Sequence, residues 1–248
     1  MRRGDHDIAR PQFEEALALL REVGGKYHIA DTLNRIGELY MLERRFDDAE
    51  AAITEAVELL REQGNISSVV EAMNRLAHVA VARGERARGV QLYEECLALA
   101  RSLGNERLVA AMLYNLSQQS LAAGDLVRAS EQARESILIY QATARDVGIA
   151  ACLATFAALA AAGGDGRAAV QLFAAADAAN PHHAESFDQL ERLTDHTGTI
   201  ESLRAALGAG EFAAAWVEGR ALSHDDAIAL AFGADLDSAA QSVTDAAE

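Results

Sequence analysis

The stretch "LNRIGELYMLERRFDDAEAAITEA", residues 33–56, is followed forty residues later by "MNRLAHVAVARGERARGVQLYEEC", residues 73–96, with the same pattern. In the first part of each, apolar or small residues recur at spacings of three and four, which is the spacing of one helix face. In the second part, a small residue is followed four positions later by a larger one. The pattern predicts two helices joined by a short turn, repeated with a period of forty residues.

The turn positions follow the same period. One set comprises Gly4, Gly84, Gly124 and Gly164, with Arg44 in the missing place, and the other comprises Gly24, Gly64 and Gly104, with Ala144 in its fourth place. Because glycine readily takes the left-handed conformation that ends many helices, these positions divide the chain into helix pairs. The predicted repeat region, 1–180, holds a half unit at 5–25 and units at 26–65, 66–105, 106–145 and 146–180.

The second helix of each predicted pair carries three packing positions in a fixed register. They are Ala9, Phe13 and Ala16, then Ala49, Ile53 and Ala56, then Gly89, Tyr93 and Cys96, then Ala129, Ala133 and Ser136, then Ala169, Phe173 and Ala176. A small residue lets two helices approach closely, and the larger neighbour fills the groove beside it. One pair cannot bury this face alone, whereas a stack of pairs can.

This spacing of small and large residues resembles the tetratricopeptide repeat, in a long form of forty residues. The usual tryptophan of the first helix is Leu or Met here, and the proline that ends the second helix is absent. The resemblance implies an all-α, right-handed α-solenoid. Residues 5–23 fit a second helix with no first helix before them, so we expect the chain to be a fragment, or a late-starting reading frame, of a longer protein.

Composition and charge limit the classes of function. The chain has 38 acidic and 22 basic residues, a formal net charge of −16, and residues 184–248 are its most acidic part. Such a chain repels phosphate backbones and anionic lipids, which argues against direct binding to nucleic acid or membranes. The two cysteines, Cys96 and Cys152, fall in packing register, and no apolar leader opens the chain. We therefore expect a cytoplasmic protein.

In stacked pairs the first helices line the inner, concave surface, and residues beside their packing face point into a groove. The candidates for binding a partner there are Asp31, Asn34, Glu38, Met41, Glu71, Asn74, His78, Tyr114, Asn115 and Gln118. An asparagine can grip a peptide backbone because its amide both donates and accepts hydrogen bonds. The alternative is that these residues are merely the solvated face of the helices.

The residue patterns of common catalytic sites are absent. The only lysine, Lys26, does not belong to a GxxxxGK phosphate-binding loop, and neither GxSxG nor HExxH occurs. His182 and His183, with Glu185 and Asp188, suggest a metal cluster, but adjacent histidines diverge on a helix, and a polar linker explains them better. We predict no enzyme activity, no metal and no cofactor.

After Pro181 the forty-residue register stops. The stretch "GEFAAAWVEGRALSHDDAIALAF", residues 210–232, has two short helical patterns, and its acidic second helix argues against a DNA-binding helix-turn-helix. We instead expect residues 181–233 to form a helical cap, with Phe212 and Trp216 covering an alanine-rich face. That face comprises Ala151, Ala154, Ala158 and Ala161. The acidic tail at 234–248 is expected to be flexible.

A second resemblance concerns the C-terminal part. "GRAAVQLFAAADAAN", residues 166–180, and "LRAALGAGEFAAAWVEGRALSHDDAIALAF", residues 203–232, resemble the end of large bacterial regulators in which a signal-transduction ATPase precedes tetratricopeptide repeats, including LuxR-type transcription factors. The resemblance implies a sensor or scaffold arm that binds a protein, a peptide or a small inducer, with an ATPase domain upstream in the parent. A stand-alone adaptor that binds a partner peptide is the alternative, and an enzyme with its site in the groove is the rival of a different class.

Overall fold

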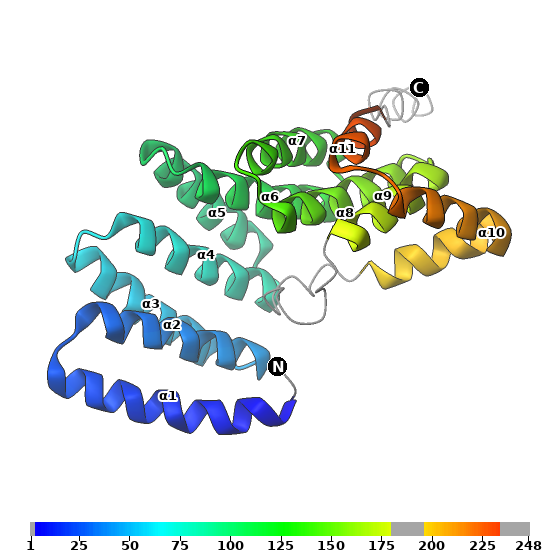
Figure 1. Ribbon diagram of the computed structural model, residues 1–248. Coiled ribbons are helices and arrows are strands. Elements are labelled where there is room, and N and C mark those ends of the chain that lie inside the picture. Colours follow the sequence, from blue (N-terminus) through cyan, green and yellow to red (C-terminus); the bar gives the residue numbers. More distant parts are fainter. Residues whose placement is uncertain (1–2, 180–195, 234–248) are drawn as a thin grey trace. The chain divides into compact units, whose positions relative to one another are not determined.

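The computed structural model describes residues 3–179 and 196–233, and these ranges form eleven helices with no strand among them. The chain divides into two compact units, unit 1 at Met1–Leu108 and unit 2 at Val109–Glu248 (Figure 1). Unit 1 contains α1 (Arg3–Val23), α2 (Lys26–Leu42), α3 (Phe46–Glu62), α4 (Ile66–Arg83) and α5 (Arg86–Ser102). Unit 2 contains most of α6 (Glu106–Ala122), then α7 (Leu126–Ala142), α8 (Asp146–Ala162), α9 (Gly166–Ala179), α10 (Thr197–Arg220) and α11 (His224–Gly233). The prediction of an all-α fold of helix pairs is confirmed.

The turns between these helices use the left-handed conformation at the positions that the period indicates. Positive φ angles occur at Gly24, Gly64, Gly84, Gly104, Gly124 and Gly164, and also at Arg44 and Ala144. Gly4 differs, because it lies inside α1. The first turn of a helix has N–H groups without intrahelical acceptors, so a glycine is tolerated there. In four of these turns the residue after the glycine caps the next helix, because its side-chain oxygen accepts a hydrogen bond from a backbone N–H group three residues later. These residues are Asn65, Asn105, Asp125 and Asp165.

Unit 1 is held together by close helix crossings. A Cβ atom placed on Gly37 of α2 would lie 2.4 Å from the Cγ1 atom of Ile53 in α3, so only glycine permits this approach. The equivalent crossing of α5 on α4 uses Gly89, where an added Cβ would lie 2.5 Å from the Cγ2 atom of Val81. Ile53 and Tyr93 fill the grooves beside these crossings and are fully buried.

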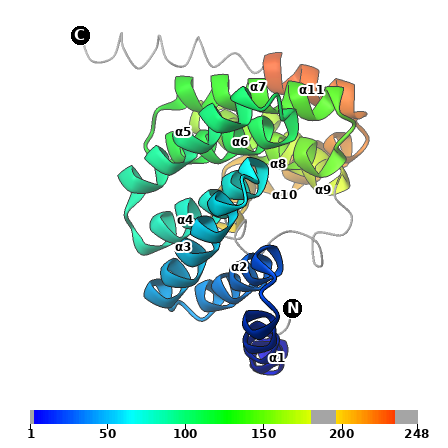
Figure 2. The ribbon, with the colours of Figure 1, turned by 90° about the vertical axis from the view of Figure 1, so that its left-hand side faces the viewer.

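Unit 2 repeats this packing and then departs from it after α9. Ser136 of α7 donates a hydrogen bond of 2.8 Å to the backbone carbonyl of Ala110 in α6, which marks another close crossing. After α9, α10 packs mainly on α9, and α11 contacts both α8 and α9 (Figure 2). Gly208 interrupts α10 with φ 77° and ψ 159°, so the helix is bent there.

The C-terminal helices close the hydrophobic core of unit 2. Phe212 is buried, and Trp216 is partly buried and stacked on it, with ring centroids 5.7 Å apart. Ala151, Ala154, Ala158 and Ala161 are partly buried against the same core. Phe232 of α11 contacts Phe156 of α8 edge to face, so α11 also helps to cover α8. The predicted residues 181–195 of the cap and the tail at 234–248 lie outside the described residues.

No helix in the described ranges is both long and apolar enough to cross a membrane.

Candidate functional site on the first helices

The predicted partner-binding residues lie on α2, α4 and α6, the first helices of their pairs. α2 and α4 contact each other directly within unit 1, while Tyr114, Asn115 and Gln118 belong to unit 2. The two groups therefore belong to different units. We use the name first-helix face for the unit 1 residues Asp31, Asn34, Glu38, Glu71, Asn74 and His78.

Acidic residues of the first-helix face are paired with arginines. Glu38 of α2 accepts a hydrogen bond of 2.5 Å from the Nε atom of Arg75 in α4. Arg75 also donates to the backbone carbonyl of Glu71 at 3.1 Å, and the carboxylate of Glu71 pairs with Arg107. The first of these contacts joins α4 to α2, and the last joins α4 to the start of α6.

The remaining acidic residue of this face is paired within its own helix. Asp31 accepts a hydrogen bond of 3.1 Å from Arg35, one helical turn further along α2. Both side chains are about half exposed, so this pair contributes little to stability and its members remain accessible to a partner.

Asn34 is the least satisfied polar residue of this face. Its side chain is only 8% exposed, and its Oδ1 atom is buried without a hydrogen-bond partner. A buried acceptor without a donor costs about 1–3 kcal/mol. Because this oxygen is itself buried, a ligand N–H group would recover that free energy only by displacing the side chains that cover it. Asn74, the equivalent residue on α4, is half-buried.

The side chain of His78 on α4 contacts α5, the second helix of its own pair. Its Nδ1 atom is hydrogen-bonded to the hydroxyl of Tyr93 at 3.0 Å, and the two rings meet edge to face. Burial, and to a lesser extent the positive charge of Arg75, lower the pKa of His78 to about 4. Burial also raises the pKa of Tyr93. The imidazole is therefore neutral at pH 7, and in the tautomer with an unprotonated Nδ1 it accepts a hydrogen bond from the tyrosine hydroxyl.

Besides Asn34, three of the predicted residues are buried among the helices. Met41 is 7% exposed and Tyr114 is 9% exposed. Gln118 is 7% exposed and donates a hydrogen bond of 2.5 Å to the hydroxyl of Thr155 in α8. This bond lies eighty residues after the Glu38 and Arg75 pair, at the same repeat positions, so both pairs join successive first helices. Asn115 is half-buried on α6.

Sequence reasoning missed the arginines of this face. Arg35 and Arg75 follow the two predicted asparagines in "LNR" and "MNR", so the same forty-residue period marks them. The recurrence of an arginine at this position was the signal that could have identified these residues from the sequence. The pairing of Arg75 with Glu38 on the neighbouring first helix depends on helix–helix geometry, which periodicity alone does not supply.

The cysteines and possible metal ligands show no reactive arrangement in the part of the chain that the structure describes. Cys96 and Cys152 are buried and are not joined in a disulfide, and burial raises the pKa of the Cys96 thiol to about 12. Among those same residues, no cluster of three His, Cys, Asp or Glu side chains could hold a metal ion. The histidine pair at 182 and 183, with Glu185 and Asp188, lies outside the described ranges.

The internal repeat of helix pairs agrees with comparisons to known proteins. Residues 1–62 match the tetratricopeptide repeat family. The structure is similar to the crystal structure of BtubC (BKLC) from P. vanneervenii, with a TM-score of 0.65 and 17% identity over 91% of this chain and 90% of that chain. It is also similar to the apo form of RapI, with a TM-score of 0.61 and 15% identity over 94% of this chain and 70% of that chain. No curated protein sequence matches the chain. At these identities the structural likeness concerns the fold.

Proposed function

We propose that the chain is a non-catalytic scaffold that binds a protein or peptide segment on the first-helix face of unit 1. The observation that carries the proposal is the unpaired, buried Oδ1 atom of Asn34. It lies on the same face as the half-exposed Asp31 and Arg35. A bound backbone N–H group that displaced the side chains covering this oxygen would satisfy it, and the charges around it would select the flanking side chains. The match of residues 1–62 to tetratricopeptide repeats supports a scaffold.

The test compares which partner proteins three forms of the full chain capture from a native cell lysate. The double variant Asn34→Ala/Asn74→Ala removes both amides, and Gln63→Ala removes an exposed amide at the end of α3 as a matched control. We expect proteins captured by the wild type and by Gln63→Ala to be depleted from the double variant, as quantified by mass spectrometry. The melting temperature should be unchanged or higher, because the substitution at Asn34 removes an unsatisfied acceptor. Equal capture by all three forms would refute the role of this face.

We further propose that the chain serves as the regulatory arm of a larger bacterial ATPase-type transcriptional regulator. The support is the resemblance of residues 166–180 and 203–232 to the end of such proteins. In that arrangement a protein, a peptide or a small inducer bound to the repeats would control an ATPase domain upstream. An ATPase encoded in frame before this segment, whose hydrolysis rate changes when the segment is deleted, is the expected result.

A stand-alone adaptor is the second candidate. The observation that favours it is the similarity to BtubC, which covers 91% of this chain and 90% of the other, so the fold of nearly the whole chain matches nearly the whole of that one. An independent start site with its own ribosome-binding sequence would support the adaptor and contradict the regulatory arm.

A further inference from the structure

Gly208 divides α10 into two helical segments. Its φ of 77° and ψ of 159° lie in a region that is essentially restricted to glycine. A Cβ atom placed on it would meet no other part of the chain within 4 Å, so this break lies in open space. We call residues 197–207, before the break, the lid segment, and residues 209–220, after it, the anchored segment.

The two segments run along α9 in opposite directions. The lid segment begins beside Phe173, whose ring centroid is 5.1 Å from that of His196, and it ends beside Gly166. The anchored segment begins near Arg167 and ends at Asp177. The break therefore reverses the chain between two short helices (Figure 1).

The anchored segment is fixed to α9 by polar contacts as well as by packing. Glu218 accepts hydrogen bonds from Arg167 and Gln171 of α9, at 2.7 and 2.8 Å. Arg220 forms an ion pair with Asp177 at the other end of α9. The buried residues of this segment are Phe212, Ala215 and Gly219. Displacing the anchored segment would break all of these contacts together.

The lid segment is held to α9 by apolar packing. Leu203 is 8% exposed, and Ile200 and Leu207 are partly buried against the same hydrophobic core. Leu203 and Leu207 lie 3.4 and 3.7 Å from the Cβ position of Gly166 at the start of α9. Among the described side chains, none of residues 198–207 forms a hydrogen bond or an ion pair with α9. The lid segment is therefore the more easily displaced of the two.

A cation–π contact links the two segments across the break. The guanidinium group of Arg204 lies over the ring of Phe212, 4.7 Å from its centroid. Arg204 is exposed, and cation–π contacts at exposed sites are weak. This contact favours the closed position of the lid segment without making it permanent.

We propose that the lid segment opens about Gly208 as a rigid helix, while the anchored segment stays on α9, and that this opening uncovers an apolar surface of unit 2. Gly166, Val170 and Phe173 follow one another on α9 at spacings of four and three residues, which places Val170 beneath the lid segment. Val170 is 0% exposed in the closed position. The lid segment thus controls access to this surface. The first-helix face belongs to unit 1, so the two proposals stand independently.

Thiol labelling measures the opening. Val170→Cys places a reporter beneath the lid segment, and Cys152 of α8, which is 0% exposed, reports opening of the unit 2 core in the same molecule. Each thiol reacts with N-ethylmaleimide in the folded chain, and its rate, followed by mass spectrometry, is divided by its rate in the urea-unfolded chain. We expect this ratio to be at least about tenfold higher at Val170→Cys than at Cys152. Leu203→Cys, on the opposite side of the same interface, repeats the test if the substitution on α9 disturbs folding.

Two further comparisons test the hinge and the contact across it. Ala215→Cys, at a buried residue of the anchored segment, should be labelled as slowly as Cys152. Arg204→Gln should raise the labelling rate at Val170→Cys by about two- to fivefold, because it removes the cation–π contact. Glu201→Gln, at an exposed residue of the lid segment, should leave that rate unchanged.

Amide hydrogen exchange distinguishes a rigid lid from local unfolding. A helix that moves intact keeps its backbone hydrogen bonds, so the amides of residues 201–207 should be protected at least about tenfold more than the thiol at Val170→Cys. Equal protection of these amides and the thiol would show that the segment unfolds instead. Equal labelling of Val170→Cys and Cys152, or labelling of Ala215→Cys as fast as that of Val170→Cys, would also overturn the proposal.

Discussion

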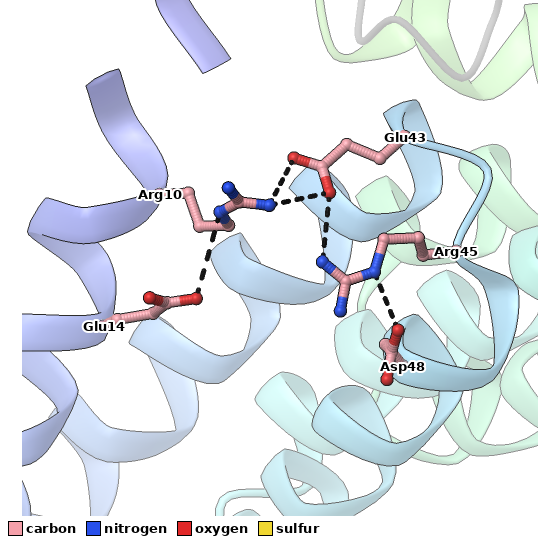
Figure 3. Close-up of polar contacts among 5 residues, drawn as sticks. All are labelled: Arg10, Glu14, Glu43, Arg45 and Asp48. Atoms are coloured by element: carbon pink, nitrogen blue, oxygen red, sulfur yellow. Dashed lines mark hydrogen bonds and ion pairs between the residues drawn. The ribbon is translucent and has the colours of Figure 1, made fainter. Parts of the chain in front are cut away.

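Arg10 donates two hydrogen bonds to the carboxylate of Glu43, at 3.3 and 3.2 Å (Figure 3). Forty residues later the same two positions are occupied by Glu50 and Arg83, which pair at 2.7 Å with the charges exchanged. All four side chains are only 21–32% exposed. If α1 packed on α4 instead of α2, Arg10 would face Arg83. The reversal of charge therefore penalises a wrong order of helices.

Reversing the first pair tests this assignment. Arg10→Glu places two carboxylates together and should lower the free energy of unfolding by about 1 kcal/mol, a typical value for a partly exposed pair. The double variant Arg10→Glu/Glu43→Arg restores the attraction and should recover about half of the loss, since the new arginine then lies near Arg45. Urea unfolding followed by circular dichroism measures both. A double variant less stable than the single one would contradict the assignment.

The forty-residue period was sufficient to predict the turns, even where glycine is missing. Arg44 and Ala144 take φ angles of 60° and 50° in the two places where the period calls for a left-handed residue. Recurrence in sequence identifies such positions because each repeat must reverse direction at the same point. Gly4 shows the limit of this inference, because the same spacing there falls inside a helix.

Glycine should therefore stabilise the chain at these two turns. A non-glycine residue in the left-handed region costs about 1–2 kcal/mol. Glycine avoids this steric cost, although it loses more conformational entropy on folding. Arg44→Gly and Ala144→Gly should each raise the free energy of unfolding by about 0.5–1 kcal/mol. Gly84→Ala, at φ 93° with open space around the added Cβ, should lower it by a similar amount. Thermal unfolding of the three variants measures the differences, and the same sign for all three would contradict the explanation.

The candidate site was less predictable than the turns. Periodicity identified Asn34 as a polar residue beside the packing face, but whether a partner satisfies its amide depends on which side chains a neighbouring helix presents. The same holds for Gln118, which forms a buried bond to Thr155. The contact of α10 with α9 lies outside the repeat, so no internal comparison could locate it.

Gly219 lies at the contact between α10 and α9. A Cβ atom on Gly219 would lie 2.2 Å from the backbone carbonyl oxygen of Gln171 and 2.6 Å from its Cα atom. Gly219→Ala should therefore push α10 away from α9 and cost about 2–3 kcal/mol. Gly210→Ala is the matched control, because it lies in the same helix with nothing within 4 Å and should stabilise by about 0.5–1 kcal/mol. Denaturation followed by the fluorescence of Trp216 distinguishes the two, and a neutral Gly219→Ala would refute the close approach.

Phe212 should contribute more than Trp216 to the stability of the cap. Phe212 is 6% exposed, whereas Trp216 is only partly buried and stacks on it. Phe212→Ala should cost about 3–4 kcal/mol, because it removes a buried ring. Trp216→Ala should cost about 1–2 kcal/mol, because its area is only partly withdrawn from water. Chemical denaturation followed by circular dichroism measures both variants. A larger loss at Trp216 would show that this ring is the main anchor.

The low pKa of His78 should make unit 1 less stable in mild acid. The folded pKa is about 4, below the ordinary value of 6.5, so the unfolded chain binds a proton first as the pH falls. The contribution of this residue to the free energy of unfolding is therefore complete above pH 6.5 and decreases between pH 6.5 and 4. Because the ring is partly exposed, we expect a loss on the order of 2 kcal/mol. His78→Gln should remove this dependence, and His28→Gln, at an exposed residue of α2, should retain it. Urea unfolding at pH 7.5 and pH 4.5 measures the change, and parallel losses in all three proteins would assign the acid sensitivity to other groups.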